Sequence, residues 1–370
     1  MAPLLIALSL GCSPSEVEES PPTDTNTDTD TDTLTDTGSE DGLIWPETDW
    51  SEGEPEDHGY DASLLDAVRE YAFTKQHNTQ AVVIIKDGVL IAEWYAEDAD
   101  RDTPVTSWSA AKSVTSALFG VAIREQLLSL DDPIGAHVTE WSDAAYDNIT
   151  IRNMLYMESG LEENTSNHYG VYGSSNQLAY SLARTPSWEP GVAYNYVNED
   201  SMVLGGALSA AFGKEVGQVA EEEIFAPIGM NATWWTDTAG STLTYCCIDS
   251  TARDFARFGL LFARNGMWQG QQLIPEDFVA ESTEGVAFHG YYGLHWWDYG
   301  TPFAAIGYHG QFVFVYPEED LVITRFGRYL QVGDEPVRDS SWENYQSTED
   351  SGPFDEMQFL DLIEDAMLPK

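Results

Sequence analysis

Two stretches far apart in the sequence, residues 81–97 and 312–327, have the pattern of β-hairpins. The first, AVVIIKDGVLIAEWYAE, contains Asp87-Gly88, a dipeptide that suits a tight turn between two β-rich runs. The second, FVFVYPEEDLVITRFG, is divided by a turn from Pro317 to Asp320. The sequence between the hairpins is mostly helical or irregular. We therefore expect an α/β protein of the α+β type, with an antiparallel sheet from both ends of the chain, flanking helices and an inserted helical region.

Amphipathic helices are expected beside both hairpins. Residues 62–76 carry apolar side chains at helical spacing and follow Asp61, a good N-cap residue. Near the other end, residues 354–368, FDEMQFLDLIEDAML, have the same periodicity. The active site is expected where the sheet meets the inserted helical region.

The N-terminal part of the chain has the features of an export signal followed by a tether. Residues 1–12, MAPLLIALSLGC, form an apolar run that is too short to span a bilayer and resembles a bacterial lipoprotein signal. That resemblance implies lipidation of Cys12 and an exported protein, held at a membrane only by this anchor; the alternative is a plain cleaved signal and a secreted protein. Residues 13–57 are polar and repetitive, so we expect a disordered acidic linker, and residues 58–370 should form the folded domain.

The overall charge limits the partners of this protein. It has 63 Asp and Glu residues against 16 Lys and Arg residues, which gives a formal net charge of −47. Such a surface repels phosphate backbones and anionic lipid headgroups, so we expect no nucleic-acid partner. The sequence has no His-Glu-x-x-His motif, no phosphate-binding glycine loop and no metal-ligand spacing among its histidines. We therefore expect no metal and no cofactor, and a small molecule as the ligand.

Ser109-Ala-Ala-Lys112 is the first motif with chemical potential. If a helix begins near Ser109, the serine hydroxyl and the lysine amine share one helix face. A serine becomes a useful nucleophile when a neighbouring base takes its proton, and a lysine is such a base once burial or nearby positive charge lowers its pKa. The motif alone is weak, because an N-capping serine beside an exposed lysine has the same spacing.

Two further segments make the pattern specific. Tyr196-Val197-Asn198 precedes a predicted helix, and a glycine-bearing strand follows at Tyr308-His309-Gly310. Together with Ser-x-x-Lys, this order resembles the serine β-lactamase and penicillin-binding-protein superfamily, in particular its class C-like hydrolase branch with esterases and aminohexanoate-dimer hydrolases. The resemblance extends from about residue 61 to the C-terminus and includes the segments SLDDPIGAHVTEW, ITIRNMLYMESGLE and STARDFARFGLLFARNGMWQGQQLIPEDF.

This resemblance implies roles for the motif residues. Ser109 would be the acylated nucleophile and Lys112 its proton acceptor. Tyr196 would pass protons to the leaving group and later activate water, and we expect its phenol to ionise more easily beside a cationic lysine. Asn198 would orient Lys112 or the substrate amide. Without the first motif, Tyr196 is equally well a core aromatic residue, and Asn198 a helix cap.

The third segment departs from the β-lactamase pattern. β-Lactamases have Lys-Thr-Gly where this chain has Tyr308-His309-Gly310, so the cation that attracts a substrate carboxylate is missing. We expect the main chain of Gln311 to supply an oxyanion donor beside that of Ser109, and Gly310 to admit the substrate to the strand edge. His309 is a wall residue, a substrate contact or a satisfied polar group. Arg325, on the next strand, would replace the missing cation if it pointed into the pocket.

These observations predict a serine hydrolase that acts through an acyl-enzyme on a neutral ester or small amide. The alternatives are a β-lactamase or D-alanyl-D-alanine carboxypeptidase, and a binding lipoprotein that keeps the fold without catalysis. Within the loop from residue 160 to 188, Tyr169 and Tyr172 are candidate substrate contacts, although an ordinary surface loop has the same composition.

Cys246 and Cys247 are adjacent in the sequence. Because neighbouring Cα atoms lie about 3.8 Å apart, less than the usual span of a disulfide, we expect two buried thiols; the alternative, in an exported protein, is a strained disulfide.

Overall fold

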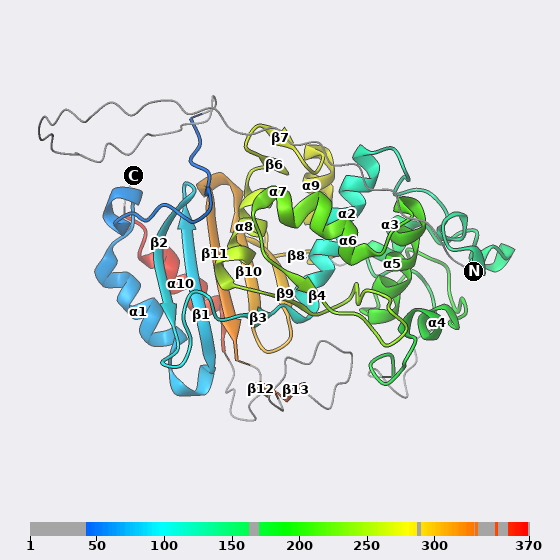
Figure 1. The fold of residues 1–370 in the computed structure, drawn as a ribbon, viewed down its shortest axis with the longest axis horizontal. Helices are drawn as coiled ribbons and strands as arrows, with labels where there is room; N and C mark the ends of the chain where they lie inside the picture. The colour runs from blue at the N-terminus through cyan, green and yellow to red at the C-terminus, as the bar shows by residue number, and fades with distance from the viewer. Residues whose placement is uncertain are drawn as a thin grey trace, which may run out of the picture. The chain divides into compact units, whose positions relative to one another are not determined.

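The computed structural model describes residues 42–162, 170–286, 290–328, 330–331, 345–346 and 354–368. Within them, the main sheet has six strands in the order β2-β1-β11-β10-β9-β8, and every neighbouring pair is antiparallel (Figure 1). Its strands are β1 (Thr79–Lys86), β2 (Val89–Tyr95), β8 (Trp297–Asp298), β9 (Phe303–Gly307), β10 (Gln311–Tyr316) and β11 (Leu321–Gly327). The expected sheet from both ends of the chain is confirmed, since β1 pairs with β11.

The turns and terminal helices also agree with the sequence. The β1–β2 turn lies at Asp87-Gly88, and both residues have positive φ, which suits a tight hairpin. Helix α1 (Ala62–Ala72) begins after Asp61, whose side chain accepts hydrogen bonds from the backbone of Ser63 and Leu64. Helix α10 (Glu356–Asp365) follows Asp355 in the same way.

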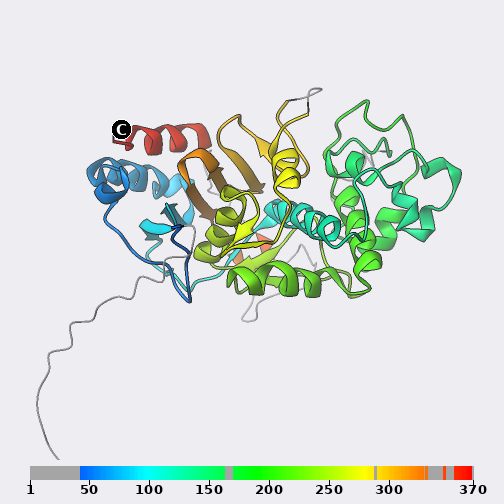
Figure 2. The same ribbon diagram turned by 90° about the horizontal axis from the view of Figure 1, so that it is seen from above.

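Helices cover both faces of the sheet. Successive residues of a strand point to opposite faces, and each face carries apolar side chains that need cover. Helices α1 and α10 pack on one face, over a cluster that includes Val82, Ile84 and Ile323 (Figure 2). Helix α8 (Ala252–Ala263) packs on the other face, over a cluster that includes Val83 and Val322. The second cluster continues into the helical region, so sheet and helices share one core.

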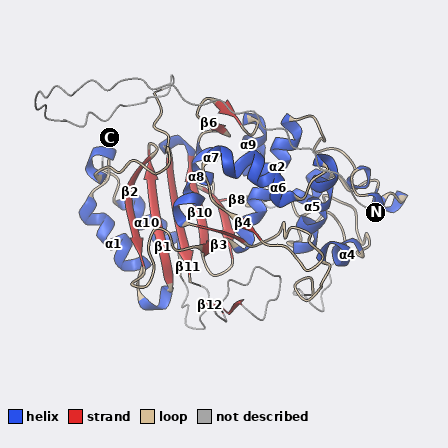
Figure 3. Cartoon of the chain, in the orientation of Figure 1, coloured by secondary structure: helices blue, strands red, loops and turns tan. Residues whose placement is uncertain are grey.

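The helical region occupies the middle of the chain, as expected, and lies on the side of the sheet away from β2 (Figure 3). Its central helices are α2 (Ala111–Arg124) and α5 (Asn198–Phe212), which contact each other. Other α-helices of this region are α3 (Ile151–Leu155), α4 (Gln177–Leu182), α6 (Val216–Ala220), α7 (Ala226–Ile228) and α9 (Glu276–Thr283). In the described ranges, every helix is too short or too polar to span a lipid bilayer.

Short strands complete the structure. A small sheet of β3 (Val105–Thr106), β5 (Ile248–Ser250) and β4 (Thr233–Trp234) lies close to the start of α2. Two further strand pairs are β6 (Met267–Trp268) with β7 (Gln271–Gln272), and β12 (Leu330–Gln331) with β13 (Tyr345–Gln346).

Residues 42–57 belong to the folded part, so the expected end of the linker at residue 57 lies too late in the chain. Trp45 packs against Trp268 and the guanidinium of Arg264, and Trp50 is buried. The backbone of this leading segment also pairs with the edge strand β2, where Gly53 donates to the carbonyl oxygen of Leu90 over 3.1 Å. Two tryptophans in a polar stretch are the signal for this packing. Cys12 and residues 13–41 lie outside the described residues.

Candidate active site

Ser109 lies in a single 3-10 turn, Trp108–Ala110, between β3 and α2. Hydrogen bonds between Ser107 and Ile248 hold the start of this turn: the Ser107 amide donates to the Ile248 carbonyl oxygen over 2.9 Å, and the Ile248 amide donates to Ser107 Oγ over 2.8 Å. Trp108 has φ +46°, a conformation that non-glycine residues adopt infrequently. Ser109 does not cap the helix, because Ala110 occupies that position. Its hydroxyl is therefore not committed to the helix terminus.

Lys112 is buried on α2 and its Nζ atom has neighbours on three sides. It donates to Asn198 Oδ1 over 2.8 Å and to the carbonyl oxygen of Tyr245 over 2.9 Å, and it lies 3.3 Å from Ser109 Oγ. A neutral amine has two N–H groups and one lone pair. When both N–H groups are bound to the acceptors, the lone pair remains for the serine proton.

The surroundings of Lys112 favour this neutral form. Desolvation by burial lowers the pKa of Lys112 well below its usual value, while the negative charge of Glu199 opposes the shift. The predicted proximity of Ser109 and Lys112 is thus observed, together with the environment that a lysine base requires.

Tyr196 approaches the same centre from the segment before α5. Lys112 Nζ lies 4.8 Å from the centre of its ring. Desolvation raises the pKa of Tyr196 to about 12, although a hydrogen bond with the Ser109 side chain lowers it. The expectation of an easily ionised phenol is therefore not met. At neutral pH the phenol is protonated and suits donation of a proton.

Asn198 connects the lysine to one of the predicted loop tyrosines. It is the first residue of α5, where Val197 is the cap, so it does not act as the helix cap. Its Oδ1 atom accepts from Lys112, and its Nδ2 atom donates to the Tyr172 hydroxyl over 3.0 Å. Tyr172 therefore reaches Lys112 indirectly, through a hydrogen bond to Asn198. Tyr169 lies outside the described residues.

The third predicted segment forms the turn between β9 and β10. Gly307, at the end of β9, lies against the Ser107–Trp108 backbone, so close that a Cβ atom would be 2.1 Å from the Ser107 carbonyl oxygen. The exposed Tyr308 ring meets the Trp108 ring edge-on, with centres 6.0 Å apart. His309 follows with φ +60° and a pKa lowered by desolvation. This end of β9 is the part of the sheet that borders the serine turn.

Gln311 and Gly310 have structural roles behind that turn. Gln311 is fully buried and pairs with Gly307, and its side chain exchanges hydrogen bonds with the Gly327 backbone over 3.1 and 3.3 Å. Gly310 has φ +74°, and a Cβ atom there would lie 2.3 Å from Arg325 Nη1. The role of Gln311 as an oxyanion donor stays a prediction.

Arg325 does not restore the missing cation. Its guanidinium donates to the carbonyl oxygens of His309 and Gly310 over 3.1 and 2.8 Å, to the His77 carbonyl oxygen, and to Thr79 Oγ1. All of its N–H groups are used in supporting the turn from behind.

Comparison with known proteins identifies the family of this chain. A family model described as Beta-lactamase matches residues 64–338. The chain belongs to the β-lactamase family.

Proteins similar to this chain differ in what they are named for. A D-aminopeptidase from Brucella anthropi is 29% identical over 198 residues, which are 49% of this chain and only 37% of that protein. A solved structure named as a 6-aminohexanoate-dimer hydrolase from Bacillus anthracis has a TM-score of 0.67 at 19% identity, and covers 89% of this chain and 91% of its own. A family VIII carboxylesterase has a TM-score of 0.63 at 14% identity, with 85% and 99% covered. These two structures share the fold of this chain, which confirms the expected fold class.

Two residues of this β-lactamase-family site were not predicted. The carbonyl oxygen of Tyr245 binds Lys112, but a main-chain acceptor has no sequence signal. His295 is buried with φ +63°, accepts from Ser113 Oγ through its carbonyl oxygen, and lies 3.0 Å from Ser201 Oγ through Nε2. Burial lowers the pKa of His295 to about 3, and Lys112 in its protonated form contributes to this shift. His295 thus joins the two central helices, through its carbonyl oxygen to Ser113 of α2 and through its ring to Ser201 of α5.

Cys246 and Cys247 form a disulfide, so the expectation of two thiols is wrong. The argument from the usual Cα separation failed because the backbone here adopts an uncommon shape, with φ +75° at Cys247. Both residues are buried, in a cluster with Trp108, Met202 and Tyr245.

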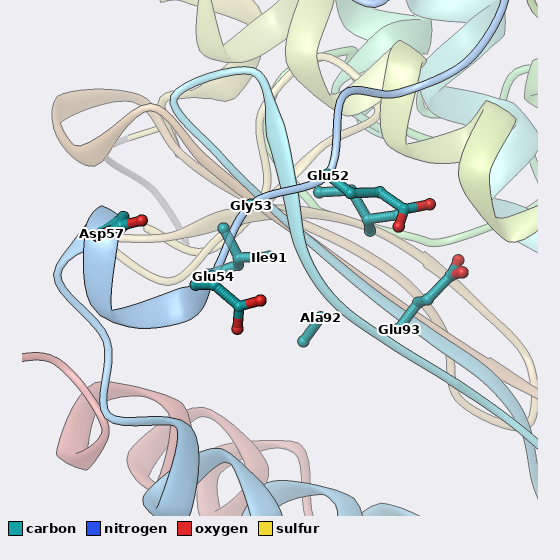
Figure 4. Close-up of a pocket in the computed structure, with 8 residues that line it drawn as sticks. Glu52, Gly53, Glu54, Asp57, Ile91, Ala92 and Glu93 are labelled. Carbon is teal, nitrogen blue, oxygen red and sulfur yellow. The ribbon is translucent and has the colours of Figure 1, made fainter.

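A separate hollow of about 480 Å³ lies between the leading segment and β2 (Figure 4). Acidic side chains line it, but Glu93 binds Arg253 through both carboxylate oxygens over 2.6 and 2.7 Å, and Glu52 pairs with Arg101 over 3.4 Å. It contains none of the predicted site residues. The described part of the chain holds no cluster of acidic, histidine and cysteine side chains suited to a metal ion.

Proposed function

We propose that this protein is a serine hydrolase that acts through an acyl-enzyme on a neutral ester or small amide. The observation that carries this proposal is the buried Lys112 amine, which is 3.3 Å from Ser109 Oγ and has acceptors for both of its N–H groups. A neutral lysine in this arrangement is a base aimed at a serine hydroxyl.

Acylation follows from the positions of the three side chains. Ser109 Oγ attacks the substrate carbonyl carbon and its proton moves to Lys112 Nζ. The tetrahedral intermediate collapses when the leaving alkoxide or amine takes the phenolic proton of Tyr196, whose high pKa keeps that proton in place until then. Lys112 then returns a proton to the Tyr196 phenolate, so the relay is reset. Water repeats the sequence on the acyl-enzyme and releases the acid.

The preference for neutral substrates rests on charge. The turn that replaces Lys-Thr-Gly offers no lysine, and the guanidinium of Arg325 is bound to the carbonyl oxygens of this turn. A carboxylate that enters a protein site must give up water and needs a cation or several donors in return. A neutral ester or amide avoids this cost. The carboxylesterase and the D-aminopeptidase among the similar proteins support both bond types as candidates.

Ser109→Ala tests the proposal. We expect the variant to fold, to lose hydrolysis of p-nitrophenyl butyrate and to lose covalent labelling by a fluorophosphonate probe, because the nucleophile is gone. Ser116→Ala is the matched control: Ser116 lies on the same helix, and its buried hydroxyl has no hydrogen-bond partner among the described residues. Unchanged hydrolysis in Ser109→Ala would refute the mechanism. A wild-type protein without labelling or turnover would favour the non-catalytic binding protein.

A further inference from the structure

The disulfide between Cys246 and Cys247 lies in a segment that contacts Lys112 and the residue directly before Ser109. Tyr245, directly before it, presents its carbonyl oxygen to Lys112 Nζ over 2.9 Å. Cys247, its second member, donates its amide hydrogen to the carbonyl oxygen of Trp108 over 3.2 Å, and Trp108 directly precedes Ser109. One short stretch of backbone therefore contacts both Lys112 and the turn that carries Ser109.

The contact between Cys247 and Trp108 joins two unusual backbone conformations. Both residues have positive φ, +75° and +46°, which non-glycine residues adopt infrequently and only where the surroundings hold them. A disulfide between sequence neighbours closes a small ring through the peptide backbone, which restricts the backbone torsions of both cysteines. The bridge is thus a local constraint at the place where the serine turn needs support.

The outer side of the segment is also fixed. Trp234 Nε1 donates to the carbonyl oxygens of Leu243 and Cys246 over 2.8 and 2.9 Å, and the Trp235 amide donates to the Cys247 carbonyl oxygen over 3.0 Å. The bridge therefore lies between an anchored outer layer and the catalytic pair.

We propose that the Cys246–Cys247 disulfide is a positioning element of the active site, which holds the Tyr245 carbonyl oxygen against Lys112 and the Trp108 carbonyl oxygen against the Cys247 amide. This inference rests on the proposed function, because it assigns the bridge to the Ser109–Lys112 pair. The cysteines take no part in proton transfer; they fix the backbone that carries two of the contacts.

The first test is the chemical state of the cysteines. In full-length protein, unfolded without reductant and treated with iodoacetamide, we expect Cys246 and Cys247 to stay unmodified, and the peptide that contains them to be lighter by two hydrogens than after reduction. Alkylation of both residues without reductant would overturn the proposal.

The second test compares two variants that both remove the bridge. Cys246→Ala/Cys247→Ala leaves a side chain at the positive φ, whereas Cys246→Ala/Cys247→Gly adopts that φ without strain. We expect kcat to fall about tenfold or more in both variants, with a smaller change in KM, because the pair is misplaced rather than the substrate site lost. If the glycine variant keeps the wild-type kcat, the backbone conformation suffices and the bridge has no positioning role.

The pH profile separates positioning from general stability. A looser segment admits water to Lys112 and relieves the desolvation that lowers its pKa, so we expect the acid limb of kcat/KM to move to higher pH in both variants. Leu243→Ala is the control: the buried side chain of Leu243 belongs to the same cluster but, being apolar, forms no hydrogen bond with Ser109 or Lys112. We expect this variant to have a lower melting temperature and an unchanged acid limb of kcat/KM. An equal shift in Leu243→Ala would show that any loosening of the cluster has the same effect, and would refute the proposal.

Failure of the proposed function would be recognised separately. If wild-type protein hydrolyses no ester or amide and takes up no serine probe, the hydrolase proposal fails. The bridge is then judged by NMR titration of Lys112 Nζ in wild type and in the two bridge variants. A higher Lys112 pKa in the variants supports positioning, and an unchanged pKa refutes it.

Discussion

Two buried basic side chains of this protein, Lys112 and Arg325, show how the same cost of burial leads to different outcomes. Lys112 lies where sheet and helices meet and has two neutral acceptors and a serine hydroxyl around its amine. Arg325 lies behind the β9–β10 turn, with all of its N–H groups donated to carbonyl and hydroxyl oxygens. Burial lowers the pKa of both groups.

The two groups differ in their protonation state once burial has lowered their pKa values. Desolvation lowers the pKa of Arg325 to about 9, so the guanidinium still carries its charge at neutral pH and acts as a support. A lysine starts from a lower pKa and can lose its proton, which suits Lys112 to the base role that we propose for it. Burial thus leaves Arg325 a charged support, whereas it favours the neutral amine of Lys112.

Exchanging the base for a permanent cation should give the largest effect. In Lys112→Arg we expect kcat/KM for p-nitrophenyl butyrate to fall by about 10³-fold or more, some 4 kcal/mol, because a guanidinium does not take the serine proton. In wild type, kcat/KM should fall as the pH drops through the lowered pKa of Lys112, since only the neutral amine is active. Steady-state kinetics across pH test both statements, with the exposed Lys214→Arg as control. A fully active Lys112→Arg enzyme would contradict the base assignment.

Removing the supporting cation should affect stability instead. In Arg325→Met we expect the free energy of unfolding to fall by about 3 kcal/mol, because the carbonyl oxygens of His77, His309 and Gly310 lose their donor. Chemical denaturation measures the change, and Lys112→Met is the matched control, for which we expect a smaller loss. If Arg325→Met unfolded as wild type does but lost turnover, Arg325 would belong to the active site and the comparison would be wrong.

The orientation of Arg325 also predicts which substrates are refused. We expect kcat/KM for nitrocefin to be at least about a hundredfold below that for p-nitrophenyl butyrate, a gap of some 2.7 kcal/mol, because its carboxylate meets no free cation at the turn. Parallel assays with the same enzyme preparation check the ratio. Nitrocefin hydrolysis that equals ester hydrolysis would establish the β-lactamase alternative.

The smallest effect is expected at Tyr172, which is linked to Lys112 through Asn198. Tyr172→Phe removes the acceptor for Asn198 Nδ2 and leaves the amide oxygen on Lys112. We expect kcat to fall severalfold, in line with about 1 kcal/mol for one hydrogen bond, and KM to change little. Tyr180→Phe, on α4, is the control. An unchanged kcat in Tyr172→Phe would leave this tyrosine an ordinary loop residue.

Local patterns predicted much of this molecule. Hairpins and terminal helices follow from residue spacing and turn chemistry, and Ser109 and Lys112 meet because a helical turn brings residues three apart together. The contact of Asn198 with Lys112 came from the family resemblance, since these residues are far apart in the sequence.

The remaining features depend on tertiary structure or on the main chain. The high pKa of Tyr196 is set by surroundings that assemble only in the fold. The orientation of Arg325 was open because a strand residue faces either side according to register. The Cys246–Cys247 bridge requires a backbone shape that average cysteine geometry does not suggest.

The leading segment has a consequence for solubility. Strand β2 is an outer strand of the main sheet, and outer strands offer unpaired amide and carbonyl groups to other molecules. Here the Ser51 carbonyl oxygen and the Gly53 amide bind the backbone of Leu90, while Asp49 is tied to Arg253 over 2.6 Å. The stretch just after the polar N-terminal region therefore shields part of that border against pairing with a second chain.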